Sequence, residues 1–163
     1  MTQSRLEQIA QQMEALGQQQ AAEDSRLDFS LASVGSLRSL FESKPRDERD
    51  YLKGGAYLGE VLRKTLGTGS WIAANSKIRS KSGAPMVSFG EWRVDPVYQL
   101  SRSLDDGLEG SSLTSTMQLI VSSIEDGVES GNLTSSYEFP SAWDRIAAAI
   151  RARRFRKRIA RRA

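Results

Sequence analysis

The stretch KGGAYLGEVLRKTLGTGSW, residues 53–71, decides the fold, because it inserts three glycines into what otherwise reads as one helix. Each glycine costs a helix interior roughly 1 kcal/mol relative to alanine. Gly55 and Gly59 lie four residues apart, so both remove a side chain along one strip of the helix surface. Such a strip lets another backbone approach closely, and we predict that it packs against a second helix or the face of a sheet. A backbone-lined groove for a ligand or a peptide is the functional alternative.

The helix that contains this stretch has start and stop signals at both ends. Asp47 is a good N-terminal cap, acidic residues follow it in the first turn, and Gly67 comes directly after Leu66 as a C-terminal cap. Glu60 lies off the predicted apolar face and four residues before Lys64, which predicts an exposed ion pair between the two. The turn LGTGSW lacks the spacing and the lysine of a phosphate-binding loop.

Two further helices are predicted before this one. Residues 4–21 carry apolar side chains at 3-4-3 spacing, which is typical of a helix lying on one partner, here the body of the protein. Residues 27–44 contain a shorter helix that Ser30 or Ser33 could cap and that Pro45 ends.

The chain becomes strand-like after Gly69. Short apolar runs at residues 70–75, 84–90 and 91–96 predict two or three antiparallel strands. Helical spacing returns at residues 96–103 and 111–128. The fold class is therefore α+β, with four to six helices packed on a small two- to three-stranded antiparallel sheet. We predict one domain over residues 1–140 and a basic C-terminal helix over residues 141–163.

The composition excludes several kinds of catalytic and metal site. The chain has no histidine and no cysteine, so it can form neither the usual zinc site nor a Ser–His or Cys–His nucleophile pair. Carboxylate or lysine chemistry and a Mg²⁺ site built from acidic residues remain open. We predict a non-enzymatic protein with no catalytic residue, no metal, no cofactor and no small-molecule substrate. No stretch has the length and apolarity of a membrane span or a signal peptide, and a cytoplasmic location is the default expectation.

Charge is distributed unevenly along the chain. Residues 1–150 hold 15 basic and 20 acidic side chains, whereas the remaining segment has eight basic and no acidic ones. Seven of the eight are arginines, which favour specific, bidentate contacts with carboxylate or phosphate. The candidate contact residues of this basic segment are Arg151, Arg153, Arg154, Arg156, Lys157, Arg158, Arg161 and Arg162.

Four roles are open for the basic segment. It could fold back on the acidic body, bind an acidic protein surface or a sibling subunit, contact nucleic-acid phosphates without sequence preference, or touch an anionic membrane surface. Trp143, Ile146 and Ile150 share one apolar face, but Phe155 and Ile159 lie further round the predicted helix. We therefore predict that the first half of this helix docks on the body and that the second half is solvated. Because the apolar side chains do not form one continuous face, peripheral membrane contact is the weakest of the four roles.

The central stretch also resembles a known group of proteins. An Asp-x-Ser segment, then Gly-Ala-Tyr-Leu-Gly-Glu, then a glycine turn and a tryptophan, is similar to the pattern of a family of uncharacterised bacterial α+β proteins. The resemblance covers about residues 27–106. Its motif residues, with a packing role and possibly a functional one, are Gly55, Tyr57, Gly59, Glu60 and Trp71. The resemblance implies helices packed on a short antiparallel sheet and an immunity or accessory role, and it carries no catalytic assignment.

These observations lead to one functional hypothesis with two alternatives. We expect a protein-binding accessory protein, of the immunity or adaptor type, from a bacterial conflict or secretion system. The alternatives are a nucleic-acid-associated protein that contacts phosphates and a subunit of a large protein assembly.

Overall fold

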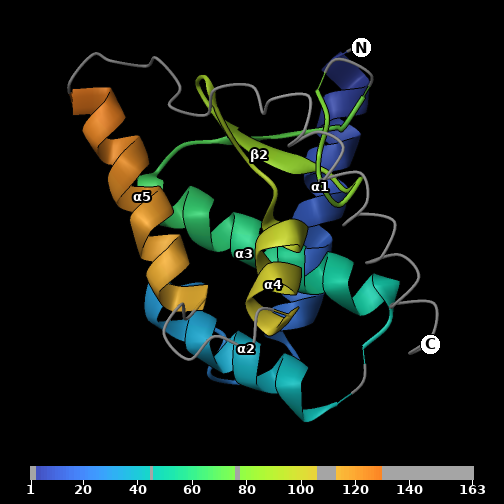
Figure 1. Ribbon diagram of the computed structural model, residues 1–163. Helices are drawn as coiled ribbons and strands as arrows, with labels where there is room; N and C mark the ends of the chain where they lie inside the picture. Colours follow the sequence, from blue (N-terminus) through green and yellow to red (C-terminus); the bar gives the residue numbers. More distant parts are fainter. Residues whose placement is uncertain (1–2, 45, 76–77, 106–112, 130–163) are drawn as a thin grey trace.

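The computed structural model describes residues 3–44, 46–75, 78–105 and 113–129. Within these ranges it shows an α+β fold of five α-helices, one short 3₁₀ helix and a three-stranded antiparallel sheet (Figure 1). In chain order the elements are α1 (Gln3–Ala21), η1 (Leu31–Ser33), α2 (Val34–Ser43), α3 (Glu48–Leu66), β1 (Ser70–Ile72), β2 (Met86–Phe89), β3 (Trp92–Val94), α4 (Pro96–Asp105) and α5 (Leu113–Glu129). The predicted fold class is confirmed; the basic helix predicted for residues 141–163 lies outside the described residues.

The long helix α3 runs through the middle of the molecule, with the other helices and the sheet around it (Figure 1). Every residue from Gly54 to Leu62 is buried, so more than two consecutive turns are enclosed on all sides. A helix that is buried all round is the central element of a core rather than a surface helix with one apolar stripe.

The ends of α3 are where the sequence predicted them. The side chain of Asp47 accepts a hydrogen bond from the backbone of Asp50, and the side chain of Asp50 accepts one from the backbone of Asp47. This reciprocal pair is a capping box, which satisfies two backbone donors that the helix itself leaves free. At the other end Gly67 has a φ of 67°, the left-handed conformation that glycine adopts without strain.

The sheet has the strand order β1-β2-β3 and presents one apolar face to α3. Trp71 pairs with Val87, and Val87 pairs with Val94, so these three buried side chains form a row across the strands. The alternate row, Ser70, Ser88 and Arg93, is exposed or half-buried. This one-sided pattern is typical of an antiparallel sheet that covers a core with one face.

Helix α1 packs along α3 and against β1. Its buried side chains Met13 and Leu16 belong to the predicted seam. Gly17 lies in the same contact, where an added Cβ would come within 3.4 Å of the Ala56 carbonyl oxygen. The expectation that the N-terminal helix docks on the body is therefore confirmed.

Candidate functional site

The glycine strip of α3 is filled by neighbouring elements. A Cβ on Gly55 would overlap Val97 of α4, and a Cβ on Gly59 would overlap the indole ring of Trp71 in β1. The third glycine, Gly54, faces Leu100 and Phe41, with a Cβ placed 2.6 Å from each. The strip therefore approaches a helix on one side and the sheet on the other, which confirms the close-packing prediction.

Glu60 is buried and accepts two hydrogen bonds, so the predicted exposed pair with Lys64 is wrong. Its Oε1 atom lies 2.7 Å from Nε1 of Trp71 and 2.8 Å from Nη1 of Arg63. Burial of this carboxylate becomes favourable because an indole N–H and a guanidinium replace the water it loses. The sequence argument failed because it considered only neighbours on α3, whereas α1 and β1 close over this position.

Arg63 extends this contact into a network that joins three segments. Its Nη1 atom also donates to Glu14 of α1 at 2.9 Å, and its Nε atom donates to the carbonyl of Gly69 at 3.0 Å. One guanidinium therefore ties α1, α3 and the turn before β1 together. Spacing alone did not single out Arg63, since its two remote partners are 6 and 49 residues away.

Tyr57 is the centre of a second buried network. The Phe29 N–H donates to the Tyr57 hydroxyl at 2.9 Å, and the Ser33 hydroxyl donates to the Ser30 carbonyl at 2.6 Å. The remaining contact, 2.5 Å between the two hydroxyl oxygens, is then donated by Tyr57 to Ser33. Burial raises the pKa of Tyr57, so its hydroxyl keeps the proton that this chain of bonds needs.

Phe29 is held in an unusual backbone conformation beside Tyr57. Its φ is 62°, which is uncommon for any residue with a side chain and rare for a bulky one. Its ring stacks on the Tyr57 ring with centroids 4.8 Å apart, and Lys64 Nζ lies 3.8 Å from its centroid. Both contacts, and the hydrogen bond from the Phe29 N–H, offset the backbone strain. No feature of the sequence predicted this conformation.

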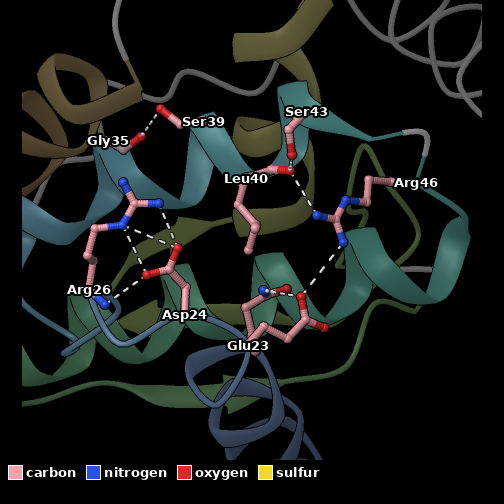
Figure 2. A network of polar contacts seen from close by, with 9 residues as sticks. Glu23, Asp24, Arg26, Gly35, Ser39, Leu40, Ser43 and Arg46 are labelled. Carbon is pink, nitrogen blue, oxygen red and sulfur yellow. Dashed lines mark hydrogen bonds and ion pairs between the residues drawn. The ribbon is translucent and has the colours of Figure 1, made fainter.

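The loop after α1 carries a surface network of ion pairs (Figure 2). Arg26 donates two hydrogen bonds to Asp24 Oδ2, the shorter at 2.6 Å, and its side-chain hydrogen bonds lower the pKa of Asp24 to about 2. Glu23 contacts Lys53 at 2.5 Å and Arg46 at 3.7 Å. Figure 2 shows Arg46 between Glu23 and the carbonyl of Leu40, so this one side chain joins the loop after α1 to the end of α2.

A buried aspartate connects the loop before β2 to α4. Asp95 accepts hydrogen bonds from the Ser82 N–H, the Ser82 hydroxyl and the Tyr98 N–H, at 2.7 to 3.0 Å. The last of these caps the N-terminus of α4. Burial raises the pKa of Asp95, although each of these hydrogen bonds opposes the shift.

The motif residues of the central stretch thus fall into three separate packing contacts. Gly59, Glu60 and Trp71 join α3 to β1, while Tyr57 binds the segment that holds Ser30 and Ser33. Gly55 belongs to a third contact, with α4. Each motif side chain is in contact with another part of the core, and the hydroxyl and carboxylate groups already have protein partners.

The predicted contact residues Arg151, Arg153, Arg154, Arg156, Lys157, Arg158, Arg161 and Arg162 lie outside the described residues. Within the described ranges, no three acidic side chains converge in a way that could hold a metal ion. None of the described helices combines the length and the apolar composition needed to cross a membrane.

No protein-family model, no curated protein and no solved structure matches this chain.

Proposed function

We propose that this chain is a non-enzymatic accessory protein that acts by binding another protein, as an immunity or adaptor protein of a bacterial conflict or secretion system does, in the cytoplasm. The observation that carries the proposal is that the polar side chains of the central motif are hydrogen-bonded to other residues of the core. These side chains, Tyr57 and Glu60, are buried and bonded to Ser33 and to Trp71. Side chains engaged in this way stabilise a scaffold, and they offer a substrate neither a free nucleophile nor a free base.

The contact surface of this scaffold is the basic segment from Arg151 to Arg162. Its arginine bias fits an acidic protein surface, since a planar guanidinium pairs with a carboxylate through two parallel hydrogen bonds. Nucleic-acid phosphates offer the same geometry, and a sibling subunit of a large assembly would present an acidic surface of the same kind. The experiment must therefore separate a protein partner from phosphate contact.

The test compares three full-length proteins, each checked for folding by circular dichroism. The first is the wild type, the second has its seven C-terminal arginines replaced by lysine, and the third has all eight basic residues, from Arg151 to Arg162, replaced by glutamine. Each protein is used to capture partners from extract of the native host at physiological salt. We expect one acidic protein to co-purify with the wild type. Less of this protein should co-purify with the lysine variant, and none with the glutamine variant.

Salt dependence provides the second measurement. Affinity for duplex DNA should fall by about 0.9 log unit per log unit of salt for each phosphate contact, because counterions are released. A protein complex should weaken less steeply, because its buried apolar contacts persist. Tight, sequence-selective nucleic-acid binding at physiological salt, equal in the wild type and the lysine variant, would overturn the proposal.

A further inference from the structure

Helix α5 has an outward-facing side that no other described element covers. Its inner face is buried in the core through Leu113, Met117, Val121 and Ile124. The opposite side is exposed, and we call it the α5 outer stripe: Gln118, Leu119, Ser122, Glu125 and Asp126. Leu119 is 68% exposed and is the one exposed large hydrophobic side chain within the described ranges.

The charge on this stripe is unfavourable for the isolated helix. Glu125 and Asp126 lie near the C-terminal end of α5, where the helix dipole is negative. The last turn has no basic residue, and neither side chain takes part in an ion pair among the described residues. A cationic group placed beside this end would reduce the repulsion between the two carboxylates and would interact favourably with the negative end of the helix dipole.

The α5 outer stripe has an apolar residue followed by acidic residues, and one segment of this chain has apolar residues followed by basic residues. Along α5, exposed Leu119 comes before Glu125 and Asp126. Along residues 143–162, the apolar face of Trp143, Ile146 and Ile150 comes before the eight basic residues. A parallel alignment therefore places apolar side chains against Leu119 and arginines against the two carboxylates.

We propose that the α5 outer stripe is the docking site for residues 143–162 of the same chain. The linking residues 130–142 are long enough for this arrangement. Thirteen residues span up to about 43 Å when extended, whereas the return from Glu129 to Leu119 along the helix is about 15 Å. The contact holds the arginines on α5 until a more acidic surface displaces them, so it acts as an internal competitor for any anionic partner.

The absence of cysteine from the chain allows a clean crosslinking test in the full-length protein. One cysteine replaces Ala152, and a second replaces Ser122 on the α5 outer stripe. The matched control carries the Ala152→Cys change together with Gln12→Cys, an exposed position on α1. Both proteins are treated at low micromolar concentration with a short bismaleimide, and crosslinked monomer is measured over time.

We expect the Ser122 pair to crosslink within the monomer about tenfold faster than the Gln12 pair. Adding Glu125→Gln and Asp126→Asn, or Leu119→Ser, should slow the Ser122 pair several-fold. All three positions are exposed, so circular dichroism should show an unchanged fold. Equal rates for the two pairs would overturn the proposal, and so would a Ser122 product that is mainly dimeric, since that would place a second copy on α5. This readout needs no external partner, so it is independent of the capture experiment above.

Discussion

At the scale of single residues, the structure shows that glycine is required where a large rigid side chain lies against a helix backbone. The ring of Trp71 occupies the space beside Gly59, and its hydrogen bond to Glu60 fixes the ring in place. Trp71 is 2% exposed, so any shift of its ring would disturb buried contacts and its hydrogen bond to Glu60. The helix-propensity cost of this glycine is thus offset by the burial of an indole.

Replacement of Gly59 by alanine should therefore destabilise the protein, by about 1–3 kcal/mol, because the added methyl group overlaps the Trp71 ring. Urea unfolding at neutral pH measures the loss. Gly35→Ala in α2 is the matched control, since its Cβ would lie 3.6 Å from Thr114 in ordinary contact. The control should stay within about 1 kcal/mol of the wild type. Equal effects of the two substitutions would show that Trp71 does not constrain this position.

At the scale of elements, α3 begins where its capping box closes. Asp47 accepts from the Asp50 N–H at 2.8 Å, and Asp50 accepts from the Asp47 N–H at 3.1 Å. These bonds depend on residues that are close in sequence, and this is why the start of α3 was predictable. The interior of α3 depends on elements remote in sequence, and there the prediction for Glu60 was wrong.

Asp47→Ala should lower the free energy of unfolding by about 0.5–2 kcal/mol, because the N-terminal donors of α3 lose their acceptor. Thermal and urea unfolding measure this loss. Asp47→Ser should retain most of the stability, since a serine hydroxyl can accept the same bond. A loss in the serine variant as large as in the alanine variant would contradict the capping role.

At the scale of the whole molecule, ion pairs at two places join α1 and the loop that follows it to the rest of the fold. Glu14 binds Arg63 of α3, and Glu23 binds Lys53 of α3 together with Arg46 of the preceding loop. Burial raises the pKa of Glu23, but its hydrogen bond to Lys53 and the charges of Lys53 and Arg46 outweigh this effect and lower the pKa below 4.5.

This shift predicts a pH dependence of stability. The pKa of Glu23 is lower in the folded state than its unfolded pKa of 4.5, so its contacts stabilise the protein fully when the pH is above 4.5. This contribution is lost as the pH falls through the pKa of the folded state. Glu23→Gln should therefore be less stable than the wild type at pH 7, and the difference should shrink in acid. Urea unfolding at both pH values measures it. Glu42→Gln, in the exposed pair with Arg38, is the control and should have a smaller effect.

If the difference between the Glu23 variant and the wild type were the same at pH 7 and well below pH 4.5, the Glu23 contacts would act through packing rather than charge. The ion-pair account of how the loop after α1 is held against α3 would then be wrong.

The sequence by itself determined the fold class, the ends of α3 and the docked face of the N-terminal helix. Caps and periodicities depend on neighbours within a few residues, so they can be read from the chain directly. Met13 and Leu16, which lie in the 3-4-3 pattern of residues 4–21, are buried as that pattern predicted.

Only the tertiary structure decided which partners the remaining polar side chains have. The burial of Glu60, the left-handed Phe29 and the Arg46 contacts each depend on contacts between different elements of the fold. The free energy that fixes such positions comes from desolvation and from partners many residues away, and a local pattern carries no information about either. The enclosure of α3 on all sides has the same origin, because elements from both ends of the described chain, namely α1, η1, β2, α4 and α5, converge on this one helix.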